Sequence, residues 1–324
     1  MGIFMGKASL RARTKMRIDE ELYKWKRSLK KYYQLYLLLI PVIANFVIFH
    51  YVPMAGIQIA FKDFSLRDGI WGSQWIGFDH FERFFNAYNF WSILSNTLIL
   101  SLLSLAFSFP LSICLALVLN EITHKRLNST LQTIFFAPHF VSTVVVVGMM
   151  QAFLSPQTGI VNVLLMKLGI IEEGIYFTRL EEYFRPMYVI SGLWQGMGWG
   201  AAIYLSALSA IDTELYDAAA VDGANKWQQL TKITLPCIWP TIVIQLILKC
   251  GHVMSVGYEK VYLMQKTTNI NVSEIISTFV YTKGIEEQMY DYSTAIGLFN
   301  SVINLIILLV VNYIAKKKSE VSLW

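Results

Sequence analysis

The chain has 324 residues, of which 55% are hydrophobic and 15% are charged, and its formal net charge is +5. Because an average soluble domain has about 25% charged residues, this composition argues against an ordinary cytosolic enzyme, and the high apolar content argues against a disordered chain. The natural solvent of such a chain is a lipid bilayer. Its three cysteines are far apart in the sequence, so neither a disulfide framework nor a metal site is expected.

Residues 1–32 form a basic segment that precedes the first long apolar run. Apolar side chains recur in it at helical spacing, at Leu22, Trp25, Leu29 and Tyr32. This pattern predicts an amphipathic helix at the inner headgroup layer of the membrane. A solvated basic tail with scattered apolar residues is the alternative.

Six nearly charge-free runs are long enough to cross a bilayer, whose apolar core of about 30 Å needs about 20 residues of helix. The runs are 33–53, 92–120, 130–154, 187–211, 236–258 and 292–315. Lys249 is the only charged residue within them. We therefore predict an all-α polytopic membrane protein with six transmembrane helices, in which a membrane domain at 33–315 is followed by a basic tail at 316–324. The first run is too long, and lacks the small-residue cleavage site, for a signal peptide.

The distribution of basic residues between the spans predicts the orientation. If the N-terminus is cytoplasmic, most of the 27 Lys and Arg residues fall in the inside segments, which are 1–32, 121–129, 212–235 and 316–324. This asymmetry satisfies the positive-inside rule and predicts that both termini are cytoplasmic. The positive net charge then reflects topology, and no nucleic-acid partner is expected.

Three outside loops follow from this orientation, at 54–91, 155–186 and 259–291. The first is rich in aromatic side chains, among them Trp71 and Trp75. Aromatic residues concentrate at membrane interfaces, so we predict a structured loop at the outer interface.

Three glycines spaced four residues apart, Gly192, Gly196 and Gly200, form a ridge in the fourth run that would let another helix approach closely. Gln195 and Trp199 share a face beside this ridge. They could offer a hydrogen bond and a stacking plane to a sugar ring in a substrate path, or they could serve helix packing.

The segment 212–235 between the fourth and fifth runs predicts a short exposed structure. Residues 213–220 favour a helix with acidic residues near its start, capped by Asp212 or Thr213. Gly223 should break this helix. A second helical stretch, 224–233, should then lead to Pro236, which can begin the next span.

This segment carries a motif of fixed spacing. Asp217-Ala218-Ala219 is followed by three residues and Gly223, and then by nine residues and Ile233-Thr234-Leu235-Pro236. In its spacing the motif resembles the Glu-Ala-Ala loop of the membrane subunits of binding-protein-dependent ABC importers. Asp217 replaces the usual glutamate and has a shorter reach. The alternative is that the alanines merely favour a helix.

The resemblance implies the type I ABC importer permease fold and a coupling helix that docks in a cleft of an ATPase subunit. It assigns ATPase coupling to the residues of the motif, which are Asp217, Ala218, Ala219, Gly223, Ile233, Leu235 and Pro236. It also implies a heterodimer with a second permease subunit and two ATP-binding subunits, which hold ATP and Mg. An extracytoplasmic solute-binding protein would dock on the outside loops and alternating access would move the substrate.

Asn96-Thr97-Leu98 and the closing segment 295–318 are similar to the carbohydrate branch of this family, which includes maltose, oligosaccharide and alginate permeases. The resemblance therefore implies that the substrate is an oligo- or polysaccharide.

The fifth run contains a polar stripe. Gln245, Lys249 and His252, with Glu259 just beyond, recur at helical spacing and should share one inward-facing side. Lys249 could attract an acidic saccharide such as a uronic-acid chain, or pair with a carbonyl or acid in the bundle. His252 could contact substrate or serve packing.

In the sixth run, Asn300 and Asn304 lie four residues apart. They are candidates for lining the substrate path or for bonding a neighbouring helix.

The sequence has no G-x-x-x-x-G-K-[ST] phosphate loop, so the energy must come from another subunit. It also lacks H-E-x-x-H and G-x-S-x-G, and its five histidines are dispersed, so we expect no catalytic residue, metal or cofactor in this chain. The rival is a secondary transporter or channel driven by an ion gradient, which often uses acids deep in the membrane. The six runs contain no Asp or Glu.

Overall fold

The structure is a computed structural model that describes residues 25, 27, 28, 30–319 and 321–323. The chain divides into two compact units, Met1–Gln58 and Ile59–Trp324, and each is considered by itself. The amphipathic helix predicted within residues 1–32 depends on Leu22 and Leu29, which lie outside the described residues.

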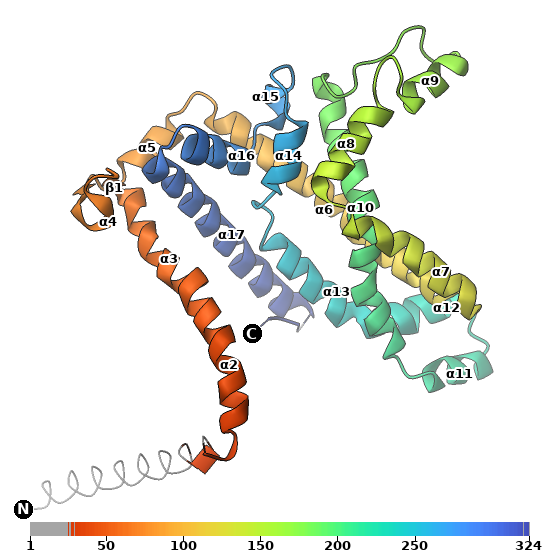
Figure 1. The fold of residues 1–324 in the computed structure, drawn as a ribbon. Helices are drawn as coiled ribbons and strands as arrows, with labels where there is room; N and C mark the ends of the chain where they lie inside the picture. Colours follow the sequence, from red (N-terminus) through yellow and green to blue (C-terminus); the bar gives the residue numbers. More distant parts are fainter. Residues whose placement is uncertain (1–24, 26, 29, 320, 324) are drawn as a thin grey trace, which may run out of the picture. The chain divides into compact units, whose positions relative to one another are not determined.

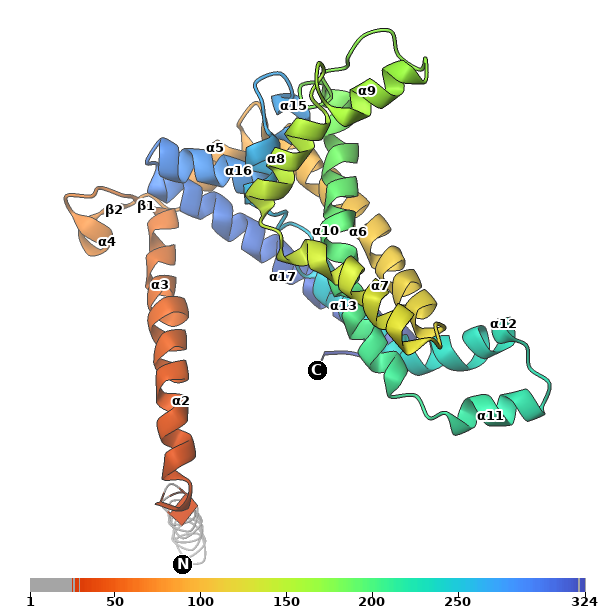
Figure 2. The same ribbon diagram turned by 45° about the vertical axis from the view of Figure 1, so that its right-hand side comes forward.

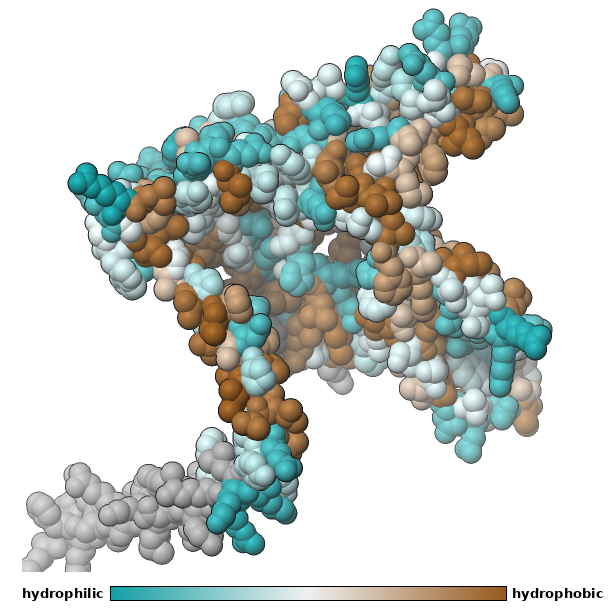
Figure 3. Space-filling model, viewed as in Figure 1, coloured by the Kyte–Doolittle hydropathy of each residue, from teal (hydrophilic) through white to brown (hydrophobic). Residues whose placement is uncertain are grey.

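From Tyr33 onward, after a bend at Tyr32, the first unit is one long helix. It passes through α2 (Tyr33–Phe46), a π-helical turn (Val47–Tyr51) and α3 (Val52–Met54), and a 3-10 stretch (Ala55–Phe61) continues it into the second unit. This stretch of 29 residues is long and apolar enough to cross a membrane. Its apolar side chains are almost all exposed, as the brown surface of α2 shows (Figure 3). Such a helix is suited to a lipid solvent.

The second unit is built on long helices. α6 (Phe90–Asn120) and α10 (Glu181–Ser209) run side by side, and α7 (Lys125–Phe136) packs against both (Figures 1 and 2). α17 (Tyr290–Ser319) packs against α13 (Leu235–Cys250).

Short elements gather at the two ends of this unit (Figures 1 and 2). One end carries α4 (Gly69–Gly72), α5 (Asp79–Phe85), α8 (Thr143–Phe153), α9 (Ile160–Lys167), α14 (Tyr258–Met264), α15 (Ile270–Ser273) and α16 (Ile276–Tyr281), which continues in a π-helical turn (Thr282–Glu286). A small antiparallel pair, β1 (Lys62–Asp63) and β2 (Gln74–Trp75), belongs to the same end. The opposite end carries α11 (Glu214–Val221) and α12 (Lys226–Gln229). Residues 59–91, 155–186 and 259–291 thus share one end, and loops 121–129 and 212–235 share the other.

The all-helical permease fold is confirmed, but six uniform spans are not. Among the described residues, four helices are long and apolar enough to cross a membrane, at Tyr33–Phe61, Phe90–Asn120, Lys226–Cys250 and Tyr290–Ser319. α10 corresponds to the predicted fourth span and has 29 residues, but it is not among these four. Its glycines, aromatic residues and Gln195 make it less apolar than the others.

The prediction of one continuous third span at 130–154 was wrong. α7 continues in a 3-10 turn (Ala137–Phe140), and α8 then leaves at an angle of 97°. The extended conformation of Val141 and Ser142 breaks the helix, and the Ser142 hydroxyl accepts a hydrogen bond from the Val145 amide at 3.4 Å. Serine favours this position because its side chain replaces a missing helical acceptor.

The predicted boundaries of the fifth span were also wrong. The helical stretch begins at Lys226 and ends at Cys250, well before residue 258. A turn follows at Gly251, where a Cβ would lie 2.7 Å from a side-chain carbon of Leu308 in α17.

The glycines of α10 allow close helix packing, although not in the predicted pattern. A Cβ at Gly200 would lie 2.6 Å from Ser112 Oγ of α6, whereas one at Gly196 would meet nothing within 4 Å. The closest approach is at Gly198, where a Cβ would lie 2.0 Å from the Phe135 carbonyl oxygen of α7. Small residues let helix backbones come together in this way.

Candidate functional site

The segment 212–235 forms a short helix, a glycine bend and a second helical stretch, as predicted. Asp212 Oδ1 accepts a hydrogen bond from the Glu214 amide at 3.0 Å, where α11 begins. At the other end, the Gly223 amide donates to the Ala220 carbonyl at 3.1 Å and the Ala224 amide donates to the Ala219 carbonyl at 2.9 Å. This pair of bonds is a Schellman motif.

Gly223 is required at this bend for its backbone conformation. Its φ is +77°, in the left-handed region, while a Cβ there would meet no atom within 4 Å. A side chain would therefore fit in space, but it would strain the backbone.

The second helical stretch differs from its prediction at 224–233. Asn225 and Gln228 form a capping box at the start of α12, and a π-helical turn at Leu230–Thr234 connects α12 to α13. Pro236 therefore lies inside a continuous helical stretch. The Leu235 amide bonds the Leu230 carbonyl five residues back, which widens the turn just before the proline.

The residues of the motif divide into an exposed group and an anchored group. Asp217, Ala218 and Gly223 are exposed, and Ala219 is half-buried. Ile233 is half-buried, Pro236 is exposed, and Leu235 packs against the apolar cluster that includes Leu208 and Ile238.

The loop also displays large apolar side chains. Val221 is 88% exposed, Trp227 is 70% exposed, and Leu215 is 48% exposed. Apolar side chains gathered on a short exposed loop are typical of a protein-binding surface.

A second candidate site is a polar cavity of about 200 Å³ near the end of α13. It contains Lys249 and His252, which the sequence had singled out, and Tyr188 of α10. Three serines of α6 that the sequence analysis missed also line it: Ser101, Ser104 and Ser108. Their spacing of three and four residues places them on one face of the helix, so this spacing was the signal in the sequence that could have found them.

The predicted single face for Gln245, Lys249, His252 and Glu259 was wrong, because α13 ends at Cys250. Gln245 is half-buried in α13, whereas His252 lies in the following turn and Glu259 lies in α14. The turn nevertheless brings His252 into the same cavity as Lys249.

Asn304 holds this turn in place. Its Oδ1 accepts a hydrogen bond from the Met254 amide at 2.9 Å, and its Nδ2 donates to Ser255 Oγ at 2.8 Å. Both the oxygen and the nitrogen of the Asn304 side-chain amide therefore have protein partners. This favours a role in bonding a neighbouring segment over a role in lining the substrate path. Ser101 Oγ also donates to the Val253 carbonyl.

Asn300 differs, because its Oδ1 is buried without a hydrogen-bond partner among the described residues. It lines another cavity of about 430 Å³, where Tyr258, Tyr281 and Tyr290 also lie. A free acceptor beside aromatic rings suits a hydroxylated ligand.

Gln195 and Trp199 lie beside the break between α7 and α8. Gln195 Nε2 donates to the Val141 carbonyl at 2.8 Å, so its amide serves the backbone of the break. The Trp199 ring stacks on the His139 ring, with centroids 4.7 Å apart and an interplanar angle of 3°. Trp199 is half exposed.

Sequence reasoning missed Lys260, a buried cation in α14. Its Nζ donates to the Tyr188 carbonyl at 3.1 Å and lies 4.8 Å from the centroid of the Tyr188 ring. Gly192 makes room, since a Cβ there would lie 3.4 Å from Lys260 Nζ. Burial lowers the pKa of Lys260 to about 8. The only sequence signal for the burial of Lys260 was its position among apolar residues of a short helix.

The opposite end from α11 has a polar cavity of about 860 Å³, lined by Arg179, Arg185, Glu181 and Glu182 among others. Arg185 Nη2 donates to Asn96 Oδ1 at 3.0 Å. Arg185 Nε is buried without a hydrogen-bond partner among the described residues.

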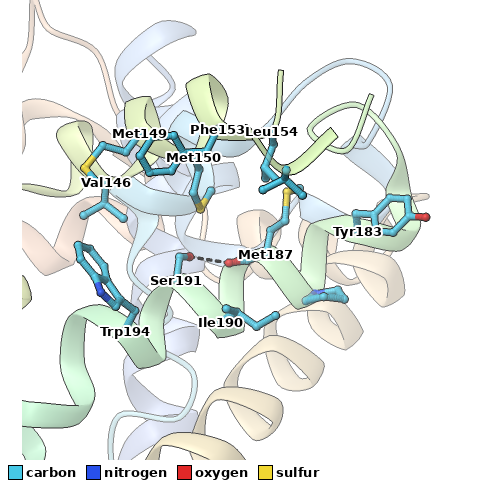
Figure 4. A pocket seen from close by; sticks show the side chains of 12 residues that line it. Val146, Met149, Met150, Phe153, Leu154, Tyr183, Met187, Ile190, Ser191 and Trp194 are labelled. Carbon is cyan, nitrogen blue, oxygen red and sulfur yellow. Dashed lines mark hydrogen bonds between the residues drawn. The ribbon is translucent and has the colours of Figure 1, made fainter. Parts of the chain in front are cut away.

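A further cavity, of about 520 Å³, is almost wholly apolar and lies between α8, α9 and α10 (Figure 4). Its Ser191 hydroxyl is committed to the Met187 carbonyl at 2.5 Å. Sugar hydroxyls placed there would lose hydrogen bonds without replacement, so this cavity is unsuited to a saccharide.

Comparison with known proteins gives a consistent result. The family model described as "Binding-protein-dependent transport system inner membrane component" matches residues 108–320. Protein LplB of Bacillus subtilis (strain 168) is 44% identical over 300 residues, covering 93% of this chain and 94% of that protein. The polygalacturonan/rhamnogalacturonan transport system permease protein YteP of the same strain is 43% identical over 304 residues, covering 93% of this chain and 94% of that protein.

The chain is also similar to a solved structure. A chain in the crystal structure of a bacterial alginate ABC transporter, in complex with an alginate pentasaccharide-bound periplasmic protein, is 40% identical with a TM-score of 0.83. The similarity covers 92% of this chain and 99% of that chain.

Proposed function

The chain belongs to the family of binding-protein-dependent transport system inner membrane components, and on this premise we propose that it forms half of the pore of an ATP-driven importer of acidic oligosaccharides. At the coarser level it is a multi-pass membrane permease subunit of a carbohydrate ABC importer. A second permease subunit would complete the pore, and two partner subunits would bind ATP and Mg. An extracytoplasmic solute-binding protein would deliver the saccharide. Both chain termini would be cytoplasmic.

The observation that carries the coupling proposal is the geometry of loop 212–235. α11 displays Asp217 and Ala218 to solvent, and the Gly223 bend fixes where it ends. A short helix with small side chains can enter a groove of an ATPase subunit closely. Closing of the ATPases on ATP would then move this helix and reorient the pore, in a rigid-body transition.

The acidic character of the substrate is proposed from the positive charge of the polar cavity. Lys249 is half-buried and shares the cavity with His252, serine hydroxyls and Tyr188. A cation in a medium of low dielectric attracts a carboxylate strongly, and the hydroxyls can bond sugar oxygens. The names of two similar proteins refer to polygalacturonan/rhamnogalacturonan and to alginate, both acidic polysaccharides.

The test is transport in liposomes that contain this chain with its partner permease and ATPase subunits. The probes are an alginate pentasaccharide and an oligogalacturonide, each bound to the solute-binding protein, with maltopentaose as the neutral control. We expect the loaded binding protein to stimulate ATP hydrolysis, and we expect uptake of the acidic sugars to require ATP and to persist when ionophores collapse all ion gradients.

Uptake that continues without ATP and stops with the ionophore would overturn the proposal in favour of a secondary transporter. Equal uptake of maltopentaose would refute the acidic specificity and leave the ATP-driven importer intact.

A further inference from the structure

The loop helix α11 is tied to the fifth span by a single side-chain hydrogen bond among the described residues. The Tyr216 hydroxyl lies 3.0 Å from Thr234 Oγ1. No residue of α11 is buried, so apolar packing contributes little to its position. α11 and α12 lie at the same end of the unit (Figure 2), but the backbone route between them passes through the Gly223 bend.

The far end of this hydrogen bond is firmly anchored. Thr234 is only 5% exposed, and the next residue, Leu235, packs on the inner apolar cluster. Thr234 Oγ1 also donates to the Gln229 carbonyl at 3.4 Å. Either hydroxyl can donate in the bond with Tyr216. When Thr234 donates to Gln229, Tyr216 is the donor, because a threonine hydroxyl has one hydrogen. The result is a relay from α11 through Thr234 to the backbone of α12.

The relay ends at the most irregular part of the fifth span. Leu230–Thr234 is a π-helical turn, and Pro236, which has no amide hydrogen, follows it. π-helical turns are rare in proteins overall, but those that occur are often at functional sites. Helices bend at such turns and at prolines. A displacement applied at Thr234 would therefore act where this helix can change direction at low cost.

We propose that Tyr216 is a positioning residue for energy coupling, because its hydrogen bond to Thr234 makes α11 and the base of the fifth span move as one body. This inference rests on the proposed docking of α11 on an ATPase. Without the bond, a docked α11 can follow the ATPase while the Gly223 bend absorbs the movement. ATP hydrolysis then continues, but less of it drives transport.

The expected loss of transport per ATP follows from the free energy that one hydrogen bond contributes. The net contribution of such a bond corresponds to about a twofold to tenfold change in an equilibrium. We therefore expect transport per ATP hydrolysed to fall by about twofold to tenfold when the bond is removed.

The experiment compares four variants in the reconstituted importer with the alginate pentasaccharide as substrate. Tyr216→Phe and Thr234→Val each remove the bond while keeping size, and the double variant tests whether they act through one interaction. Thr234→Ser is the matched control, because it keeps the hydroxyl. Each is measured for ATP hydrolysis, for sugar uptake and for assembly of the complex.

We expect both single variants to assemble, to hydrolyse ATP at nearly the wild-type rate and to lose transport per ATP. We expect the double variant to be no worse than the poorer single variant, and we expect Thr234→Ser to keep the wild-type coupling. Unchanged transport per ATP in both single variants, additive losses in the double variant, or an equal loss in Thr234→Ser would overturn the inference.

Failure of the proposed function gives a different result. In that case the wild-type complex shows no ATP-dependent uptake at all. If the wild type is coupled and Tyr216→Phe is equally well coupled, only the role of this hydrogen bond is refuted.

Discussion

The loop at 212–235 leads into the helical stretch Lys226–Cys250, and Lys249 of the polar cavity lies near the far end of that stretch. The two regions are built in opposite ways. In the loop, α11 has no buried residue, ends at the Gly223 bend and is tied to the fifth span by one side-chain hydrogen bond among the described residues, at Tyr216. The cavity is lined by α6, α10, the end of α13 and the turn after it, and Asn304 of α17 holds that turn. The difference suggests a division of work, in which the loop receives a partner and the cavity presents fixed polar groups to a ligand.

The largest expected effect comes from a substitution at the Gly223 bend, which should impair the loop and leave the polar cavity unchanged. We predict that Gly223→Val abolishes transport, because a residue with a Cβ costs about 1–2 kcal/mol in the left-handed conformation and valine is worse there than most residues. Membrane insertion should be normal, since no buried packing is altered. Uptake in liposomes and membrane yield are the measurements.

The matched control at the bend is Gly223→Asn, because asparagine tolerates the left-handed conformation better than other residues with side chains. It should keep most of the transport activity. Normal transport by Gly223→Val would contradict the role of the bend.

The next largest effect belongs to the cavity. We predict that Lys249→Ala lowers uptake of the alginate pentasaccharide by about tenfold to a hundredfold, the worth of a hydrogen bond to a charged group. Loop function should be unaffected, so basal ATP hydrolysis should stay normal. Lys249→Arg keeps the charge and should retain part of the uptake, whereas wild-type uptake by Lys249→Ala would remove the support for an acidic ligand.

Substitution of the two asparagines of α17, Asn300 and Asn304, should show which of them has a structural role and which faces a ligand. Asn304→Ala leaves the buried Met254 amide unpaired and should lower the free energy of unfolding by about 1–3 kcal/mol. Asn300→Ala removes an oxygen that has no partner in the described part of the chain, so thermal stability should hardly change. Thermal unfolding in detergent compares the two, and equal losses would contradict the distinction.

The smallest effect concerns an exposed contact of the loop. Lys226 Nζ and Glu121 Oε2 are 3.3 Å apart, and both side chains are mostly exposed. Such pairs contribute about 0–1 kcal/mol, so Glu121→Gln should leave transport within about twofold of the wild type. A loss as large as that of Tyr216→Phe would show that this ion pair, too, transmits the movement of the loop.

The sequence predicts the parts of this molecule that depend on local pattern. The run at 92–120 nearly coincides with α6, and the run at 292–315 lies within α17, because long apolar stretches have few alternatives to a helix. The Gly223 bend was also predicted, since a glycine after a capped alanine-rich helix is a local signal.

Features that depend on tertiary contact were missed. The break at Val141 is stabilised by Gln195 of α10, and the turn after Cys250 is held by Asn304 of α17. The serines of α6 belong to the polar cavity only because α6 crosses near α13. Periodicity within one helix cannot reveal such partners.

The most direct test of the central claim is cross-linking from α11 in the assembled importer. Ala218→Cys is placed in a chain whose own Cys114, Cys237 and Cys250 are replaced by serine, since two of these thiols are exposed. Leu66→Cys, an exposed position at the opposite end of the unit, is the control. The account predicts a cross-link from position 218 to an ATP-hydrolysing subunit and none from position 66. A complex that transports sugar normally but gives no cross-link from position 218 to such a subunit would contradict it.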